Sequence, residues 1–540
     1  MLGVIQLFSK PEEQANLNRK IMNNFLFVAS ENDAISNCKV GGVGDVIRDV
    51  PRQISKRGDR VHVVTPSYSR LHQEGTLISK LNVQLREVTY VTYLYEVKAK
   101  EEDENISHYV IHHPEIEAGN LGGIYQHDAF EPFYTDVIKF TIFCTAVAEA
   151  IKQKKFGKLD IVHLHDWHSS TLLFLKEYHP AYSALEKLRF VYCIHNLALQ
   201  GIRPFENSYS SLKNWFPKID FDKDALRDPR YADCYNLMAI GIRFADAVHT
   251  VSPSYKQDVL LPSEAPEFVG GEGLENDLRQ ADKDGRFHGI LNGSNYHDLK
   301  ETKKNKLFPN IATGIFKQLQ KEHNRQKAEF LAHTGEKVVP FLKKRPNFIC
   351  ASVARLTEQK FYFFKRSPEA LIQILDKLER VGGIYVLLGT GAPDYEELLR
   401  DISYKKRNFI FINTQSEEVV NSIYRDSDLY FMPSLFEPCG ISQMLAMRHG
   451  QPCLVHHTGG LKDTVQHVHT GFTFDGKTYD EKVYNMVEGF KEALYLFEHE
   501  KSTWKQIQLN ARKMRFTWKK SVDEYYKLLY TGNAMEVGIA

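Results

Sequence analysis

No apolar run in this chain approaches the ~20 residues that span a bilayer, so no membrane anchor is expected. The seven cysteines form no CxxC pair and show no metal-finger spacing, which predicts reduced thiols in a cytoplasm. A formal net charge of +1 gives no excess of either sign with which to bind nucleic acid or an anionic membrane. The apolar start, Met1–Phe8, lacks a basic region and a cleavage site, so we expect no signal peptide. The amino-acid composition, with 43% hydrophobic and 25% charged residues, is typical of a soluble globular protein.

The length of the chain and its apolar runs predict two α/β domains. A chain of 540 residues is too long for one ordinary core. Short apolar runs alternate with longer helical stretches, which indicates βαβ units and parallel sheets covered on both faces. The expected strands are residues 25–29, 60–66, 160–164, 190–194 and 247–251 in the first half, and 347–351, 383–388, 409–412, 429–432 and 452–455 in the second.

Changes in composition suggest where the domains begin and end. Residues 1–21 are expected to form an N-terminal extension, and residues 22–296 the first domain. Residues 297–345 are rich in Lys, Glu, Gln and Asn, which predicts an interdomain connection that includes helix. Residues 346–500 then form the second domain, and residues 501–540 a helical tail rich in aromatic side chains.

Two glycine-containing turns, one in each half of the chain, are candidate anion-binding loops. The first, Lys39–Val46, exposes backbone amides at a helix start, although it is not the GxGxxG dinucleotide motif. In the second, Pro438 restricts Glu437 to extended conformations and Gly440 permits close approach of a ligand, so the carboxylate is placed to bind a hydroxyl. The alternative for the first turn is a tight turn with a surface lysine, and the alternative for the second is that Glu437 caps the start of a helix.

Polar residues also follow three of the expected strands. The segment His163–His168 contains three histidines and an aspartate, which could bind a metal ion, but no further ligands at metal spacing are evident. We expect a polar lining there instead, in which Asp166 binds sugar hydroxyls. His195 ends another buried strand, where it either contacts a ligand or is a structural hydrogen-bonding group. Arg355 and Lys360 either hold a diphosphate and stabilise it as it leaves, or form a solvated basic turn.

The ordered set of motifs resembles the glycogen and starch synthases, which are retaining glucosyltransferases with the GT-B arrangement. The resemblance runs from about Phe25 to Tyr530. It lies in residues 39–46, 165–168, 195–201, 251–255, 290–293, 355–360, 437–443 and 458–465, and in the tail from residue 516. It implies an α/β fold of two Rossmann-like domains facing each other across a deep cleft, with a C-terminal helix that crosses back to the first domain. Many other GT-B transferases have a second glutamate eight residues after the first, and Leu445 in that place favours the glycogen and starch synthases.

The resemblance also implies ligands and the residues that bind them. The donor is ADP-glucose or UDP-glucose, with the motifs favouring ADP, and the acceptor is an α-1,4-glucan of the glycogen type. The expected catalytic residues are Glu437 on the glucose, Arg355 and Lys360 on the leaving diphosphate, and His195 and Asp166 on the glucose or the acceptor. The other expected contacts are Lys39, Gly41 and Gly42 with the donor phosphates, Asp45 and Asn292 with the glucose or the acceptor, and Cys439 and Gly440 with the donor. Because two cations carry the phosphate charge, neither a metal nor a cofactor is expected.

Three positions depart from the family pattern. Asn295 stands where the family has an aspartate, Phe361 where a glycine is expected, and Leu435 where an arginine is frequent. These changes leave the diphosphate-binding residues intact, but they open alternatives. The chain could glucosylate a different acceptor with the same fold, or it could be a catalytically silent relative that binds glucan as a scaffold.

Overall fold

The computed structural model describes residues 22–68, 71–117, 123–126, 128–296 and 306–531. The extension expected at residues 1–21 lies outside the described residues, as do residues 297–305 of the expected connection and residues 532–540 of the tail. The chain divides into two compact units, Met1–Val191 with Gly201–Asp222, and Tyr192–Gln200 with Lys223–Ala540. None of the helices in the described ranges has the length and apolar character needed to cross a bilayer.

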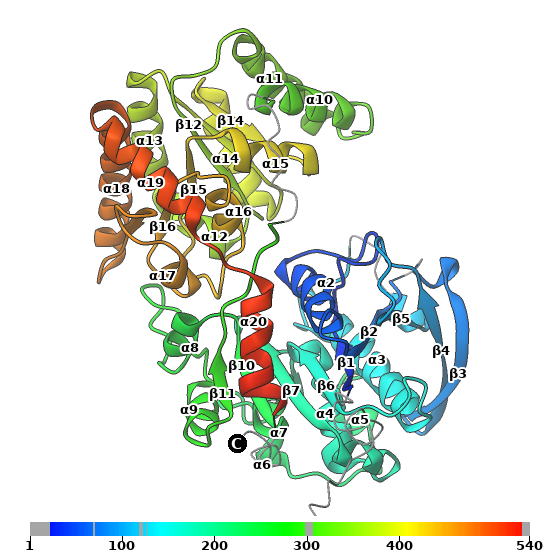
Figure 1. The fold of residues 1–540 in the computed structure, drawn as a ribbon. Coiled ribbons are helices and arrows are strands. Elements are labelled where there is room, and N and C mark those ends of the chain that lie inside the picture. The colour runs from blue at the N-terminus through cyan, green and yellow to red at the C-terminus, as the bar shows by residue number, and fades with distance from the viewer. Residues whose placement is uncertain (1–21, 69–70, 118–122, 127, 297–305, 532–540) are drawn as a thin grey trace, which may run out of the picture. The chain divides into compact units, whose positions relative to one another are not determined.

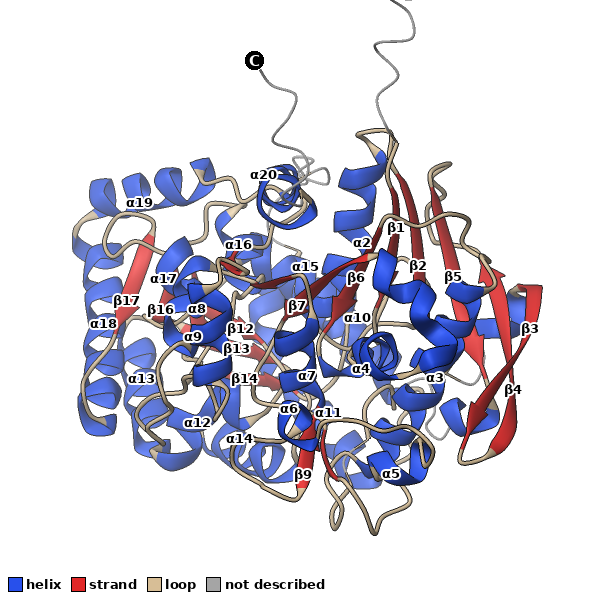
Figure 2. Cartoon of the chain, turned by 90° about the horizontal axis from the view of Figure 1, so that it is seen from below, coloured by secondary structure: helices blue, strands red, loops and turns tan. Residues whose placement is uncertain are grey.

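The first unit is built on a mixed sheet in which strands follow one another in the order β6-β1-β2-β5-β4-β3. Four of them are parallel, and β4 and β3 continue the sheet in antiparallel fashion at one edge (Figure 2). The strands are β1 (Asn24–Val28), β2 (Arg60–Pro66), β3 (Thr76–Leu85), β4 (Val88–Val97), β5 (Ile106–His112), β6 (Ile161–His165) and the short β8 (Ile202–Pro204). The helices are α2 (Gly42–Ser55), α3 (Tyr134–Lys152), α4 (Thr171–Tyr178) and α5 (Leu212–Trp215).

The hairpin of β3 and β4 was not expected from the sequence. Its two-residue loop consists of Arg86 and Glu87, both with positive φ (52° and 61°). Hairpin loops of this kind favour Asn and Gly, so the usual signal is missing here. Tertiary contacts hold the loop instead: the Arg86 guanidinium lies over the rings of Tyr209 and Trp215, at 3.3 and 3.4 Å from their centroids.

The second unit contains an all-parallel sheet in the order β14-β13-β12-β15-β16-β17. In chain order this is 3-2-1-4-5-6, the arrangement of a dinucleotide-binding sheet, whose direction of winding reverses between its first and fourth strands. The strands are β12 (Ile349–Val353), β13 (Ile384–Leu388), β14 (Phe409–Ile412), β15 (Leu429–Met432), β16 (Cys453–His456) and β17 (Gly471–Phe474). The helices that follow β12 are α12 (Glu358–Arg366), α13 (Pro368–Arg380), α14 (Pro393–Lys405), α15 (Glu417–Asp426), α16 (Ser442–Met447), α17 (Gly460–Thr464), α18 (Tyr479–His499) and α19 (Lys501–Lys513).

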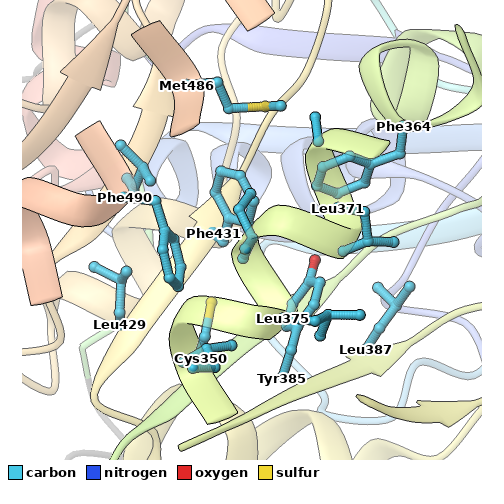
Figure 3. Close-up of a cluster of buried hydrophobic side chains, with 14 of the residues drawn as sticks. Cys350, Phe364, Leu371, Leu375, Tyr385, Leu387, Leu429, Phe431, Met486 and Phe490 are labelled. Atoms are coloured by element: carbon cyan, nitrogen blue, oxygen red, sulfur yellow. The ribbon is translucent and has the colours of Figure 1, made fainter. Parts of the chain in front are cut away.

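Alternate residues of these strands enter two cores, one on each face of the sheet. Cys350, Tyr385 and Phe431 belong to the first core, which α13 and α18 cover with side chains such as Leu371 and Phe490 (Figure 3). The intervening strand residues, such as Ala351, Val386 and Tyr430, belong to the second core, which α10, α15 and α16 cover. The period of two along buried strands explains why the sequence shows continuous apolar runs here.

The second unit also holds chain that precedes this sheet. β7 (Arg189–Ile194) runs from one unit into the other, and the remaining elements are α6 (Lys223–Leu226), β9 (Cys234–Asn236), α7 (Leu237–Phe244), β10 (Ala247–Thr250), α8 (Pro253–Val259), α9 (Glu275–Lys283) and β11 (Phe287–Gly289). The tail helix α20 (Trp518–Tyr525) lies beside β10 (Figure 1). Ser521 Oγ donates to the carbonyl oxygen of Leu291 at 2.6 Å, and the ring of Tyr525 lies 4.8 Å from that of His249. The tail therefore packs on residues that were expected in the first domain and that here belong to the same unit as the tail.

The described part of the expected connection is helical. It holds α10 (Leu307–Leu319) and α11 (Arg325–Lys343), which contact one another and pack on α15 and β14 respectively. Thr334 Oγ1 of α11 donates to the carbonyl oxygen of Phe411 in β14 at 3.2 Å. These helices are therefore part of the second unit.

Candidate active site

The candidate site of the second unit lies at the carboxyl ends of β12 and β15. These two strands are neighbours at the point where the winding of the sheet reverses, which is where ligands of such sheets bind. The loop after β12 carries Arg355 and leads to Lys360 in the first turns of α12, and the loop after β15 carries Glu437. Strand order thus brings together residues that are 77 apart in sequence.

Lys360 and Glu437 form a close ion pair, with Nζ against Oε2. Neighbouring bonds hold the two loops in register: the amide of Leu435 donates to the carbonyl oxygen of Gln359 at 2.8 Å, and Gln359 Nε2 donates to that of Phe436 at 3.2 Å. Arg355 is exposed, and its guanidinium forms no ion pair with any described residue. The arrangement leaves one cation open to solvent and one paired with the carboxylate.

Two glycines with left-handed backbones lie around Glu437: Gly440 in the turn that follows it, and Gly459 in the loop after β16, which packs against it. Gly440 has a φ of 74°, and a Cβ there would meet the Gln443 side chain. Gln443 Nε2 lies within 3.2, 2.7 and 3.1 Å of three acceptors, the carbonyl oxygens of Cys439 and Gly440 and the hydroxyl of Thr464. Gly459 has a φ of 45°, and any Cβ there would overlap the carbonyl oxygen of Glu437. We call residues 437–440 the donor turn.

His195 and Asn292 are also buried in the second unit. Burial lowers the pKa of His195 to about 3, so the imidazole is neutral at physiological pH and acts as a hydrogen-bonding group rather than a cation. Its Nε2 lies 3.3 Å from the Sγ of Cys193. Asn292 is 4% exposed, and its Oδ1 accepts no hydrogen bond from a described residue, which suits it to a ligand hydroxyl.

Cys439 is 5% exposed, and its thiol is held in the neutral form. Burial raises the pKa of Cys439, and the nearby backbone amide of Asn292, which donates to the carbonyl oxygen of Val251 at 3.1 Å, only partly offsets the rise. The thiolate is the nucleophilic form of cysteine, so this residue lines the turn and is not a nucleophile. The offset also shows that Asn292 lies directly beside the donor turn.

The predicted residues Lys39, Gly41, Gly42 and Asp45 of the first unit lie at the start of α2. Lys39 Nζ lies 2.6 Å from Asp45 Oδ1 and 3.4 Å from Asp33 Oδ2, and Arg48 also pairs with both aspartates. Burial raises the pKa of Asp45, although Lys39 and Arg48 lower it. Lys39 therefore has carboxylate partners in this structure, and a phosphate group would compete with them for the ammonium.

The sequence did not indicate a role for Glu31, whose carboxylate accepts hydrogen bonds from the backbone amides of the first glycine turn. Glu31 Oε2 accepts from the backbone amides of Val40 at 2.7 Å and Gly41 at 2.6 Å, and Tyr125 OH donates to Oε1 at 2.6 Å. The amide of Gly41 was expected to face the donor phosphates, and here it binds a carboxylate of the chain itself. The turn does bind an anion, as its amides predict, but the anion is internal.

Asp166 directly follows β6 in the first unit and is 7% exposed. Its backbone is strained, with φ of 54° and ψ of 179°, and such conformations concentrate at functional sites. His163 and His165 stack on each other, with centroids 4.5 Å apart, and both also contact the ring of Phe27. The histidines of β6 thus have a packing role, while Asp166 lies at the strand end where the sequence placed it.

The three residues that depart from the family pattern are held by core packing or by a hydrogen bond. Phe361 is 1% exposed within the first core, and its φ of −128° is open to any residue, so nothing here requires glycine. Leu435 packs against the same core. The backbone carbonyl of Asn295 accepts from Arg448 Nη1 at 2.6 Å, which fixes this segment without the usual aspartate.

Two family models match the chain. The starch synthase catalytic domain matches residues 24–280, and glycosyl transferases group 1 matches residues 336–514. A glycogen synthase of Clostridioides difficile (strain 630) is 32% identical over 504 residues, which cover 90% of this chain and 95% of that protein. A glycogen synthase of Streptococcus mutans serotype c is 30% identical over 516 residues, 93% of this chain and 98% of that protein.

A solved structure shows the same fold. The catalytic domain of Starch Synthase IV from Arabidopsis thaliana, bound to ADP and acarbose, has a TM-score of 0.70 at 23% identity and covers 94% of this chain and 98% of its own. The predicted GT-B class of two α/β domains with parallel sheets is therefore confirmed. Together with the relatives above, which match nearly the whole length, these findings show that the chain belongs to the glycogen synthase family of glycosyltransferases.

Proposed function

We propose that this glycosyltransferase transfers glucose from ADP-glucose or UDP-glucose to the non-reducing end of an α-1,4-glucan, with retention of configuration. The bond between the sugar carbon C1 and the diphosphate breaks, a bond from C1 to an acceptor hydroxyl forms, and the nucleoside diphosphate leaves. The observation that carries the proposal is the pairing of Lys360 with Glu437 at the carboxyl ends of β12 and β15. One cation and one carboxylate at that point match the two ends of a sugar diphosphate.

The charges of the reaction explain what these residues do. As the C1 bond breaks, negative charge grows on the diphosphate and positive charge on the glucose. Arg355 and Lys360 stabilise the first, and the Glu437 carboxylate binds the hydroxyls of the second. His195 and Asn292, neutral and buried, are hydrogen-bonding partners for the sugar. Because two cations meet the diphosphate, we propose that the reaction needs no metal and no cofactor.

The residues of the first unit complete the proposal. Lys39 and the turn at Gly41 and Gly42 bind donor phosphates, and Asp45 and Asp166 contact the glucose or the acceptor. For Lys39 this requires that the donor displace or share the carboxylates of Asp33 and Asp45, which now hold the ammonium. A cytoplasmic location remains a prediction of the sequence.

The test is to incubate the protein with glycogen and each donor in turn, and to measure nucleoside diphosphate release and chain extension. Extension from ADP-glucose, in α-1,4 linkage and lost in Glu437→Ala, is the expected result. Donor consumption without extension of glycogen would point to a different acceptor, and a panel of other sugars would identify it. Binding of glycogen with no consumption of either donor would overturn the proposal in favour of a silent glucan-binding protein.

A further inference from the structure

Two short helices of the second unit, α8 and α17, cap one another. Asp463 of α17 accepts from the backbone amide of Ser254 at 2.9 Å and from its hydroxyl at 2.8 Å, in the first turn of α8. In return, Asp258 of α8 accepts from the backbone amide of Gly459, directly before α17, at 2.9 Å. Each helix therefore supplies the acid that satisfies an orphan amide at the start of the other.

The same two helices hold the backbone of the donor turn. The amide of Gly460, the first residue of α17, donates to the carbonyl oxygen of Glu437 at 2.9 Å. Ser252, the N-cap of α8, donates through its hydroxyl to the carbonyl oxygen of Pro438 at 2.5 Å and accepts from the amide of Tyr255 at 3.2 Å. Consecutive carbonyl groups of the donor turn are thus bound by the starts of α17 and α8.

Lys462 ties the pair of helices together a second time. Its Nζ lies 3.0 Å from Asp258 Oδ1, so the Asp258 carboxylate bridges a backbone amide and a side-chain cation of α17. Asp258 is 7% exposed, and hydrogen bonds to an ionised acceptor that is shielded from water are the strong ones. The contacts join residues more than 200 apart in sequence, so they connect the end of β10 with the loop after β16.

We propose that Asp258 and Asp463 are positioning residues for the transferase reaction: through the mutual caps they fix the donor turn, and with it the Glu437 carboxylate, opposite Lys360. The inference rests on the proposed function and names residues to which neither the motifs nor the mechanism assigned a role. The backbone of Glu437 has little freedom to move, because Pro438 follows it and Gly459 lies against its carbonyl oxygen. A misplacement of 1 Å can reduce a rate by about a hundredfold.

The test compares Asp258→Ala, Asp463→Ala and the double variant with Asp282→Ala. Asp282 pairs with Lys256 of the same helix α8 at 2.5 Å, but from α9, so it is a matched control that leaves the caps in place. We expect each cap variant to lower kcat by roughly 10- to 100-fold and to raise the donor KM, with the glucan KM unchanged. The double variant should be little worse than either single one, because both caps hold the same turn.

Conservative variants separate positioning from folding. Asp463→Asn and Asp258→Asn keep an oxygen that can accept from the backbone amide, so both should recover much of the lost kcat at a melting temperature close to that of Asp282→Ala. Wild-type kinetics in the alanine variants would overturn the proposal. So would an activity loss that follows the melting temperature alone, with no asparagine rescue.

Failure of the proposed function would be visible separately. If the wild type turns over neither donor, titration calorimetry with ADP and UDP still reports on the turn. Both alanine variants should then bind the nucleotide at least several-fold more weakly than wild type and Asp282→Ala. Equal affinity in all four proteins would overturn the positioning role, whatever the protein catalyses.

Discussion

Lys360 and Glu437 neutralise one another across the neighbouring loops that follow β12 and β15, with side chains only 17% and 8% exposed. The proposed reaction gives these residues different partners, the diphosphate for the lysine and the glucose for the glutamate. A sugar diphosphate carries both groups within one molecule, so it can separate the pair and satisfy each member at the same time. A ligand with only one of the two groups would leave the other charge without its partner, which is unfavourable in a site shielded from water.

The first prediction concerns Lys360. Lys360→Ala should lower kcat by about a hundredfold, ~3 kcal/mol of transition-state stabilisation, with a smaller effect on the donor KM, because the charge on the diphosphate grows as the bond breaks. Steady-state kinetics measure both constants. Lys365→Ala is the control, since that lysine is on the same helix and pairs with Asp394 in solvent. An unchanged kcat in Lys360→Ala would remove this residue from the reaction.

A second prediction concerns Phe361, which replaces the expected glycine. Phe361→Gly should lower the free energy of unfolding by about 3–5 kcal/mol, as other Phe truncations in cores do, and leave the choice between ADP-glucose and UDP-glucose unchanged. Denaturant unfolding and the donor comparison measure the two effects. Ile372→Gly, at a 38% exposed position of α13, should cost only the helix propensity, about 1 kcal/mol. A switch of donor preference in Phe361→Gly would show that the phenylalanine acts on the ligand and not on the core.

The third prediction concerns Glu31. Glu31→Ala removes the acceptor of the Val40 and Gly41 amides, which then depend on water because this turn is partly exposed. We expect the turn to loosen and the donor KM to rise by about tenfold. Glu31→Gln keeps an acceptor oxygen and should lie between this variant and wild type. If the donor KM falls in Glu31→Ala, the carboxylate competes with the donor for these amides.

A fourth prediction is a loss of stability in mild acid. Burial lowers the pKa of several histidines, most strongly those of His62, His108 and His449, to about 4, and those of His195 and His249, to about 3. Above pH ~6.5 these imidazoles are mostly neutral in both the folded and the unfolded state. Below that pH the unfolded chain binds protons that the buried imidazoles of the folded chain do not bind. The free energy of unfolding therefore falls as the pH approaches 4. Denaturant unfolding at pH 4.5, 5.5, 6.5 and 7.5 measures the slope.

His62→Leu provides the check on this assignment. Each histidine contributes at most one proton, or ~1.4 kcal/mol per pH unit, so the variant should have a shallower slope between pH 4.5 and 6.5 by up to that amount. Its stability relative to wild type should not depend on pH above 7. If the free energy of unfolding of His62→Leu depends on pH as steeply as that of wild type, then the pKa of His62 is not lowered in the folded state.

Most of the parallel strands could be predicted, because their residues are buried on both faces and appear as short apolar runs. Strands β12 to β16 lie within two residues of the expected positions. The antiparallel pair β3 and β4 was missed for two reasons. Half of their side chains are exposed, and their loop is Arg86-Glu87, whose positive φ angles are sustained by contacts with Tyr209 and Trp215 that are far away in sequence.

The candidate site shows the same division between local and distant signals. The motifs placed Arg355, Lys360 and Glu437 at strand ends, and in the structure Lys360 and Glu437 form an ion pair that no motif indicated. No local pattern indicated that Glu31 would fill the first glycine turn, since its partners are 9 and 10 residues away in a loop without regular spacing. Asp258 lies outside the family motifs and Asp463 lies within the motif at residues 458–465, but neither position indicated mutual caps, because partners more than 200 residues apart leave no local pattern.

The contact of the tail helix with Leu291 sets an order of events during synthesis. Ser521 follows Leu291 by 230 residues. At the ~5–20 residues per second of a ribosome, Leu291 is made roughly 10–50 s before its partner exists. The carbonyl groups beside Asn292, and the surface of β10 that Tyr525 covers, are therefore open to water throughout that interval. The second unit can reach its final packing only after the tail helix α20 has been made.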